Sequence, residues 1–508
     1  MKYLLRLVLI ACLPIAGLLL YTSMRLGPGV SPDSVVYMQT ALNLLSGRGF
    51  TAFGEPMTHF APFYSIVLAL GGVLPIRILS VARLLQPAIF VFNAALFMFA
   101  VWTASRNRSI WAAAAAGGFF LTSAQVLFIH SNVWSEGLFF LLFLSGYILL
   151  VYYLESNRRT LLILSSVLIG LAIFTRYAGF ALIPPVVFIL MIGSANPMPR
   201  KIKDAGLAVM IAVAPTVSWM IHNLFLANSA TNRELAIHLF GQRHLNRFYQ
   251  TVLAYFWPSN LPDIPPATFA FVFFCTLLII ALLYFRQRLH DDTRPSRPYY
   301  LVLLNLSFAF SYLIFLIVSI SFVDAAIPMD SRLLFPFMAA IVISLVAMVC
   351  DLVSRSKRGY IVWAPLALVF VTFLGYQGQD AARHLERLQH EGIGYQNTDW
   401  VASRTVDYLQ SINLTHTVIF TNDRDVIAHR VGIDAFRVPH IFSGTSLLPN
   451  EQYQDEMSML CDAVQDGGII VYFTRIIRDF NPKPADIEAH CNLQPALVFS
   501  DGYIYQAE

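Results

Sequence analysis

The chain has 508 residues, of which 57% are hydrophobic and 13% are charged, and its formal net charge is +4. A soluble domain usually carries about 25% charged residues, so this composition, with a mean hydropathy of +0.62, excludes an ordinary soluble protein and predicts a polytopic membrane protein. Lys and Arg stand in short clusters between apolar runs. This distribution indicates topology signals, and we expect no nucleic-acid partner.

Apolar segments long enough to cross about 30 Å of hydrocarbon follow one another along the chain. They lie at about residues 3–24, 82–104, 109–129, 135–154, 205–226, 267–285, 299–321, 333–350 and 360–376. The first lacks a small-x-small cleavage site and is predicted to be a retained span. Two further segments are ambiguous. Residues 161–193 are too long for one helix and are interrupted by Arg176, and residues 60–76 are just long enough for a span.

The positive-inside rule resolves both ambiguities. If Lys2 and Arg6 are cytoplasmic and 60–76 is not a span, the later basic clusters all fall on the cytoplasmic side. These clusters are Arg106/Arg108, Arg158/Arg159, Arg200/Lys201/Lys203, Arg286/Arg288/Arg294/Arg297 and Arg355/Lys357/Arg358. The arrangement requires 161–193 to form two short spans with Arg176 at their outer turn. It predicts about eleven spans, an interfacial or re-entrant helix at 60–76, and a C-terminal region outside.

We therefore expect a mostly α fold, a polytopic helical membrane protein with a small extracytoplasmic α/β domain. The membrane domain would cover residues 1–377, with a first outer loop at 25–81 and a fourth at 227–266. The second domain would cover 378–508, where helical patterns alternate with strand patterns such as "HTVIFTN", "GIIVYFTR" and "PALVFSDGYIYQA". That alternation is typical of an α/β domain.

The cysteines do not indicate a metal centre, because no ligand cluster of the zinc type is present. Cys12, Cys275 and Cys350 lie inside apolar runs, where a thiol behaves as a small hydrophobic group. Cys461 and Cys491 lie in the polar C-terminal region and could pair if that region faces an oxidising compartment. Spacing alone does not establish a bridge, and we lean against one.

Residues 31–50, "SPDSVVYMQTALNLLSGRGF", directly follow the first span. Ser31 as N-cap and Pro32 at the first helical position predict a helix start. The apolar residues that follow form one face about three turns long, which suits a helix lying along the membrane surface, and Gly47 ends the run. Asp33 would lie in the first turn, at the outer membrane edge. Local rules alone favour a simple complement to the helix dipole, worth about 0.3–1 kcal/mol.

A longer pattern favours a function for Asp33. The spacing from Asp33 to Tyr37, followed by "LLSGRGF" and "HFAPFYSIVLAL", resembles the first outer loop of the GT-C glycosyltransferases. The similar subgroup contains the protein O-mannosyltransferases and the lipid A aminoarabinose transferases, which use polyprenyl-phosphate sugars. "SNVWSEGLFF", "TRYAGFALIP", "WMIHN" and "DSRLLFPF" follow in the family's order. One departure is that Ser34 follows Asp33 where the family often has a paired Asp-Glu, which puts a two-carboxylate or metal-assisted scheme in doubt.

The resemblance implies an integral-membrane inverting glycosyltransferase of the hexosyl or pentosyl type in the cell (inner or plasma) membrane. It would move one monosaccharide from a polyprenyl-phosphate donor to a lipid, glycan or protein acceptor on the outer face. Such a reaction needs a carboxylate base near the acceptor and cations around the departing phosphate. No cofactor would be required, and a divalent cation is left open. Two other classes stay open: a transporter or flippase of lipid-linked sugars, and a non-catalytic membrane scaffold.

Four charged residues at outer span ends are the main candidates. Asp33 would be the base. Glu136 could orient the acceptor or bind a divalent cation, or it could simply reach toward water. Arg176 and Arg332 suit the phosphate, because a guanidinium fork matches two phosphate oxygens, although both could be membrane-edge anchors.

Further candidates carry weaker signals. Asp330 accompanies the arginine in "DSRLLFPF", and Arg233 and His59 could contact sugar or phosphate, although loop solvation explains both nearly as well. Tyr37 could stack on a sugar or anchor a helix at the interface. The C-terminal stretch "TNDRDVIAH" is polar enough to form a binding edge, but it is predicted to be a turn that ends a strand.

Overall fold

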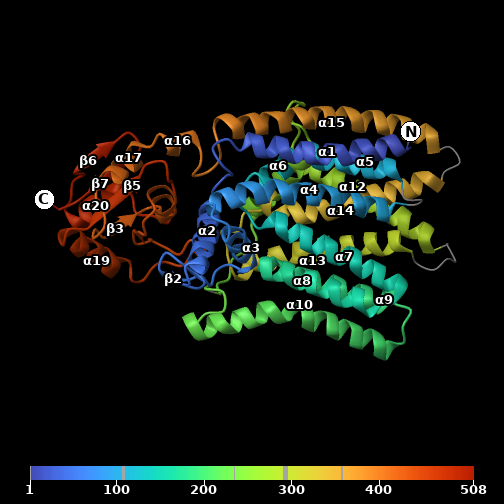
Figure 1. The fold of residues 1–508 in the computed structure, drawn as a ribbon, viewed down its shortest axis with the longest axis horizontal. Helices are drawn as coiled ribbons and strands as arrows, with labels where there is room; N and C mark the ends of the chain where they lie inside the picture. Colours follow the sequence, from blue (N-terminus) through green and yellow to red (C-terminus); the bar gives the residue numbers. More distant parts are fainter. Residues whose placement is uncertain (1, 106–108, 234, 290–295, 356–358, 508) are drawn as a thin grey trace.

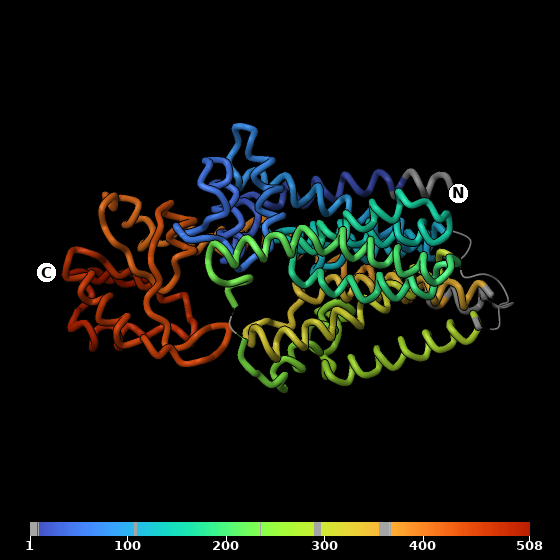
Figure 2. The backbone as a smooth tube through the Cα atoms, turned by 90° about the horizontal axis from the view of Figure 1, so that it is seen from below, coloured from blue at the N-terminus to red at the C-terminus, as the bar shows by residue number. Residues whose placement is uncertain are grey.

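The computed structural model describes residues 2–105, 109–233, 235–289, 296–355 and 359–507. Two parts follow one another along its longest axis, a bundle of long helices and a C-terminal region that contains a five-stranded sheet (Figure 1). The N-terminus lies at the end of the bundle away from the sheet, and the view from below shows the same arrangement (Figure 2). The predicted fold class, mostly α with a small C-terminal α/β region, is confirmed.

The bundle consists of apolar helices that run roughly along one direction (Figure 1). Six described helices are long and apolar enough to span a membrane, or seven if the bent pair α5 and α6 is one span. The predicted count of about eleven therefore stays a prediction. The bundle elements are α1 (Lys2–Ser23), α4 (Ile78–Ala104), α5 (Ile110–Thr122), α6 (Ala124–His130), α7 (Glu136–Ser156), α8 (Arg159–Thr175), η2 (Tyr177–Leu182), α9 (Ile183–Gly193), α10 (Met198–Ala227), α12 (Pro266–Leu289), α13 (Arg297–Phe322), α14 (Ser331–Arg355) and α15 (Gly359–His390).

The segment 161–193 is divided at Arg176, as predicted. α8 ends at Thr175, and Arg176 has extended backbone angles, with φ −151° and ψ 129°. The 3₁₀ helix η2 and then α9 follow. α9 carries proline in its first turn, a position that proline tolerates because the amide there has no partner within the helix.

Four of the described basic side chains between spans meet acidic and polar partners at one end of the bundle. Four contacts show this: Arg297 with Glu155, Arg200 with Asn157 at 3.1 Å, Lys201 with the carbonyl of Met191 at 2.8 Å, and Arg288 with Asp351 at 3.3 Å. Arg106, Arg108, Arg294, Lys357 and Arg358 lie outside the described residues. The shared end agrees with the positive-inside argument, while its cytoplasmic orientation stays a prediction.

The opposite end of the bundle is closed by the first and fourth loops. α2 (Pro32–Leu45) runs across the ends of the bundle helices, with α3 (Phe63–Gly72) beside it (Figure 1). Ser31 is the N-cap and Pro32 opens α2, as predicted, and the Ser31 N–H donates to the Ser34 Oγ at 3.0 Å. A short hairpin, β1 (Thr51–Ala52) and β2 (Glu55–Pro56), had not been predicted. The fourth loop contains α11 (Gln242–Phe256).

The C-terminal sheet has the strand order β4-β3-β5-β7-β6, in which β3 is parallel to β4 and to β5. The strands expected from the sequence are present as β3, β5 and the β6–β7 hairpin. The elements of this region are α16 (Thr398–Val401), α17 (Arg404–Ser411), β3 (Ile419–Thr421), α18 (Arg424–Val426), η3 (Ile427–Val431), β4 (Phe436–Arg437), α19 (Tyr453–Gln465), β5 (Ile469–Phe473), α20 (Pro484–Cys491), β6 (Leu497–Phe499) and β7 (Gly502–Tyr505).

Two details of this region differ from the sequence-based expectations. Cys461 and Cys491 form a disulfide that joins α19 to α20, so leaning against a bridge was wrong. The pairing depends on how two helices pack, which spacing along the chain does not show. The boundary predicted between 377 and 378 falls inside α15, and the division into domains 1–377 and 378–508 stays a prediction.

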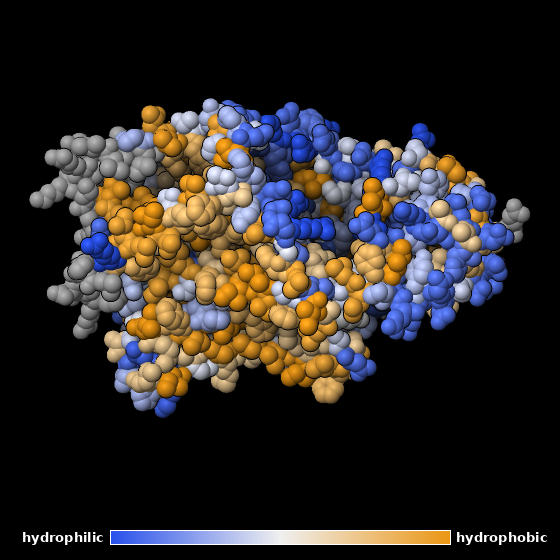
Figure 3. Space-filling model, turned by 180° about the vertical axis from the view of Figure 1, so that it is seen from behind, coloured by the Kyte–Doolittle hydropathy of each residue, from blue (hydrophilic) through white to orange (hydrophobic). Residues whose placement is uncertain are grey.

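The surface divides in the same way as the fold. Apolar side chains cover much of the helical bundle, whereas hydrophilic side chains dominate the C-terminal part (Figure 3). Exposed apolar residues on the bundle include Phe225, Phe271 and Phe310, which are 88%, 70% and 69% exposed. A surface of this kind is stable when lipid covers it. The chain is a multi-pass membrane protein.

Candidate active site at the sheet-side end of the bundle

The start of α2 is fixed by two backbone bridges to distant parts of the chain. Gly29 forms a parallel bridge with Asn132, and Val30 forms one with Gly394. A Cβ atom on residue 29 would come within 2.1 Å of the Asn132 Oδ1, so any other residue here would have to displace the Asn132 side chain. The N–H of Tyr395 donates to the Val30 carbonyl at 2.8 Å. The first loop is thereby held against both the segment before α7 and the entry to the C-terminal region.

The segment before α7 supplies two further contacts. The indole Nε1–H of Trp134 donates to the Ser31 Oγ at 2.8 Å, next to the first turn of α2. The same indole lies under the Arg332 guanidinium, 4.5 Å from its carbon to the ring centroid. The Ser135 Oγ accepts a hydrogen bond from Arg176 at 3.0 Å. Trp134 and Ser135 therefore link α2, α8 and α14 at one point.

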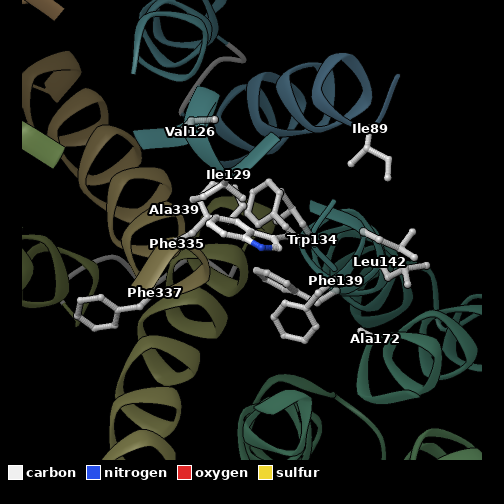
Figure 4. Close-up of a cluster of buried hydrophobic side chains, with 14 of the residues drawn as sticks. Ile89, Val126, Ile129, Trp134, Phe139, Leu142, Ala172, Phe335, Phe337 and Ala339 are labelled. Carbon is white, nitrogen blue, oxygen red and sulfur yellow. The ribbon is translucent and has the colours of Figure 1, made fainter. Parts of the chain in front are cut away.

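Apolar packing keeps the indole in place. Trp134 lies among Ile129, Phe335 and Ala339 (Figure 4), and all three of these neighbours are buried. Because the ring is surrounded in this way, it cannot turn away from the Arg332 guanidinium without opening a cavity in the core. The cation–π contact is therefore part of a fixed support for that side chain.

The charged candidates form one connected network. The carboxylate of Glu136, only 1% exposed, contacts the Arg176 Nη1 at 2.6 Å and also the Arg332 Nε. The Arg332 Nη2 in turn contacts the Asp33 Oδ2 at 2.6 Å. One buried carboxylate thus joins both guanidiniums, and one of these guanidiniums also holds Asp33. Charge-assisted contacts of this kind are short and directional, so the network fixes the relative positions of all four groups.

α11 and a helix cap position Arg332. The Thr251 hydroxyl donates to the Met329 carbonyl at 2.7 Å, and the Tyr255 hydroxyl donates to the Ser331 carbonyl at 2.8 Å. The Asp330 carboxylate accepts from the N–H of Leu333 at 3.0 Å and so caps the first turn of α14. Burial raises the pKa of Asp330 above its ordinary value, although this hydrogen bond opposes the shift. Asp330, predicted to bind substrate, is placed where it orients the helix that carries Arg332.

Asp33 is the member of the network that opens onto a cavity. Its side chain is 30% exposed, and it lines a cavity of about 1370 Å³ whose other walls come from the hairpin β1–β2 and the C-terminal region. Burial alone would raise the pKa of Asp33, but the positive charges of Arg332 and Arg176 outweigh it and hold this pKa below its ordinary value. Asp33 is therefore ionised at neutral pH.

The weaker candidates lie around this network. His59 lines the cavity, and its Nε2 is 3.5 Å from the Arg233 Nη2. Burial and the charge of Arg233 lower the pKa of His59 to about 4, so its ring is neutral at pH 7. Arg233 also faces Asp324, at 3.8 Å. Tyr37 is 2% exposed, and its hydroxyl is 3.4 Å from the Ser135 Oγ. It packs beneath the network, and its contact with a sugar stays a prediction.

The described donor groups form no cluster that would hold a divalent cation by itself, and the open question of a cation stays a prediction. Within the described ranges, no three His, Cys, Asp or Glu side chains come together as a metal-binding group. Asp33 and Glu136, the carboxylates of the network, are both in contact with Arg332. A cation placed between them would face that guanidinium, and Ser34 adds no second carboxylate in the first loop.

Sequence reasoning had not singled out Trp134 and Ser135. Both stand in the quoted motif "SNVWSEGLFF", so the signal was present, but an apolar ring and a small hydroxyl before a span carry no charge to draw attention. Their contribution depends on Arg332 and Ser31. These lie far away in the chain, the serine 103 positions from the tryptophan.

Comparison with known proteins identifies the fold. No family model and no curated protein matches the chain. Among solved structures, ArnT from Cupriavidus metallidurans in the apo state superposes with a TM-score of 0.62 and 12% identity, over 98% of this chain and 97% of ArnT. ArnT bound to undecaprenyl phosphate gives 0.60 and 14%, over 98% and 97%.

A second neighbour is more distant. The archaeal oligosaccharyltransferase AglB from Archaeoglobus fulgidus, in complex with an inhibitory peptide and a dolichol-phosphate, gives a TM-score of 0.53 and 13% identity, over 92% of this chain and 69% of AglB. These proteins belong to the GT-C superfamily of glycosyltransferases. At such identities the likeness is one of fold, and the expected GT-C resemblance is confirmed at that level.

Proposed function

We propose that this chain, which has the GT-C glycosyltransferase fold, transfers one sugar from a polyprenyl-phosphate donor to an acceptor hydroxyl on the outer face of the membrane. The observation that carries the proposal is the network itself. An ionised carboxylate on a cavity wall, Asp33, is in contact with Arg332, and Glu136 joins Arg332 to a second guanidinium. A base and two phosphate-binding groups are what such a transfer needs at one place.

In the proposed reaction, Asp33 accepts the proton of the acceptor hydroxyl as its oxygen attacks the anomeric carbon. The bond from that carbon to the donor phosphate oxygen breaks, and the polyprenyl phosphate leaves. Attack from the face opposite the leaving group inverts the anomeric centre. Arg176 and Arg332 would neutralise the charge that develops on the phosphate. Each group has one task, and no metal ion enters the scheme.

The contact between Arg332 and Asp33 suggests a coupling between donor binding and base strength. The guanidinium holds the pKa of Asp33 below its ordinary value, with burial opposing it. A donor phosphate that drew Arg332 away would remove this influence while the carboxylate stayed half-buried. The pKa of Asp33 would then rise, and its carboxylate would become a stronger base in the donor complex.

Glu136 was predicted to be catalytic, and its surroundings favour a positioning role. Its carboxylate is buried between two guanidiniums, whereas Asp33 opens onto the cavity. We therefore assign Glu136 to the orientation of Arg176 and Arg332. The outer-face location fits the proposal, because Cys461 and Cys491 are bridged and disulfides persist in oxidising compartments.

The test compares the glycolipids and glycans of a deletion strain and its parent by mass spectrometry. Deletion is expected to remove one sugar modification, which the wild-type chain and Glu451→Gln restore. Glu451 lines the same cavity and is exposed, so its variant is a matched control. Asp33→Asn is expected to lower transfer by about 10²–10⁴-fold, as for loss of a general base.

An unchanged profile in the deletion strain would contradict the transferase proposal. Full restoration by Asp33→Asn, with the protein present at the parental level, would favour the non-catalytic scaffold. If the chain is instead a transporter of lipid-linked sugars, purified protein with donor and acceptor in detergent will transfer no sugar, although deletion still removes the modification.

A further inference from the structure

The carboxyl ends of two parallel strands face the cavity that Asp33 lines. Arg424 and Asp425, which follow β3, and the segment from Arg437 to His440, at the end of β4, all belong to its wall. In open α/β sheets, ligands bind outside the carboxyl ends of the strands, at the point where the strand order reverses. Here β4 lies on one side of β3 and β5 on the other. The C-terminal region thus presents the ligand-binding edge of its sheet to Asp33.

Two arginines of this edge, Arg424 and Arg437, line the same cavity. Burial and then the positive charge of Arg437 lower the pKa of Arg424 below its ordinary value. Arg424 lies over the Phe53 ring at 4.1 Å and is 3.6 Å from a carboxylate oxygen of Glu55. Arg437 pairs with Thr421 in the β3–β4 register, and its side chain is exposed. Its guanidinium is therefore free to meet a ligand in the cavity.

The rest of the wall carries neutral groups and also carboxylates, those of Asp33, Glu55, Asp425, Glu451 and Glu456. Burial and neighbouring arginines lower the pKa of His59 and of His440 to about 4, so both rings are neutral at pH 7 and can share hydrogen bonds without adding charge. Phe53, Phe420 and Phe436 give the same wall an apolar component. The guanidinium fork of an arginine fits a carboxylate or a phosphate.

We infer that Arg437, assisted by Arg424, binds an anionic group of the acceptor and so presents the acceptor hydroxyl to Asp33. This inference rests on the proposed function, since it names the acceptor class of the same site: a molecule with a phosphate or carboxylate apart from the hydroxyl that receives the sugar. The cavity, at about 1370 Å³, exceeds the 300–1,000 Å³ typical of small-molecule sites. It has room for an acceptor larger than one sugar.

The experiment measures anion binding by the purified full-length chain in detergent. Thermal-shift titrations are run with inorganic phosphate and, separately, with acetate, each against chloride at equal ionic strength. Undecaprenyl phosphate is present throughout to fill the proposed donor-phosphate site. A ligand that binds the folded state raises Tm with a concentration dependence set by its Kd. The anion that raises Tm at the lower concentration identifies the acidic group of the acceptor.

Arg437→Gln is expected to raise the anion concentration needed for a given increase in Tm by about tenfold or more, as for loss of a charged hydrogen-bond partner. Arg437→Lys, which keeps the charge, should retain part of the effect. Arg404→Gln is the matched control, because it removes an exposed arginine of the same region at the start of α17, outside the cavity wall.

The inference is overturned if Arg437→Gln responds like the wild type, or if neither anion raises Tm above chloride. These outcomes are independent of catalysis. The proposed function fails instead if deletion leaves the glycan profile unchanged, so the two failures can be told apart. Asp33→Asn, which removes the base but not the guanidiniums, should bind the anion as the wild type does.

Discussion

Two carboxylates that line one cavity have opposite pKa shifts. Asp33, from the first loop, contacts Arg332, and its pKa lies below the ordinary value although burial opposes this. Asp425, from the C-terminal sheet, is 3% exposed, and burial together with the charge of Asp423 raises its pKa to about 7. Burial disfavours the charged form in both, and the nearest charge decides the outcome.

The difference arises in the layer behind each wall. Behind Asp33, Glu136 fixes two guanidiniums, and one of them reaches Asp33. Behind Asp425, Arg478 contacts Asp423 at 3.1 Å, and the Tyr395 hydroxyl donates to the same carboxylate at 2.7 Å. One wall is therefore suited to an ionised base, and the other carries a carboxyl that titrates near neutral pH.

The largest change should come from Glu136→Ala, which removes the support behind the first wall. Two guanidiniums would be left without their shared carboxylate in a buried place, and loss of one partner of a buried ion pair costs about 3–5 kcal/mol. We expect a large fall in Tm and loss of transfer, measured on purified protein and by glycan mass spectrometry. Glu451→Ala, an exposed acid of the cavity wall, serves as the control. An unchanged Tm would show that the guanidiniums do not depend on Glu136.

A smaller change is expected from Trp134→Phe, which sharpens the account of how Asp33 is placed. Phenylalanine keeps an aromatic ring under Arg332 but removes the hydrogen bond from the indole to Ser31. The loss of one hydrogen bond costs about 1 kcal/mol. We expect a modest fall in Tm and a lower transfer rate, because the first turn of α2 would be less firmly held. A transfer rate equal to that of the wild type would show that the hydrogen bond from Trp134 to Ser31 is not needed to hold Asp33 in place.

A pH-dependent change in stability is expected from Asp425→Asn, and it tests the second wall. The pKa of this acid is about 7 in the folded chain and near 3.8 in the unfolded chain. The acid therefore adds to the free energy of unfolding, and this contribution is complete at pH values below 3.8. This contribution is lost as pH rises through about 7. The wild type should therefore lose stability between pH 5 and pH 8 more than Asp425→Asn, as measured by Tm at each pH. The same dependence of Tm on pH in the two proteins would contradict the raised pKa of Asp425.

Much of the site was accessible from local sequence. Ser31 and Pro32 gave the start of α2, and the interruption at Arg176 gave the turn between α8 and η2. Placing charges at outer span ends was enough to select Asp33 and Arg332, because topology brings all such ends to one face of a membrane. These predictions depend on the nearest few residues or on the side of the bilayer, and both leave a pattern in the sequence.

The roles of several candidates were not accessible in that way. Tyr37 and Asp330 were selected as substrate-binding residues, but Tyr37 is buried against Ser135, and Asp330 caps α14. Whether a residue is buried or lines a cavity depends on which other elements pack against it. The sequence around the residue does not show those elements. Trp134 carried no charge, and so its double contact with Ser31 and Arg332 became visible only in the folded chain.

The sequence by itself determined the apolar segments, the helix caps and the end of the bundle at which the charged residues gather. The tertiary structure decided that Arg332 meets Glu136, 196 positions away, that Val30 pairs with Gly394, and that the sheet edge around Arg437 shares a cavity with Asp33. The physical reason is that helix starts and spans are stabilised by neighbouring residues and by lipid. Contacts across long chain separations form only when the packing of many other side chains brings the partners together.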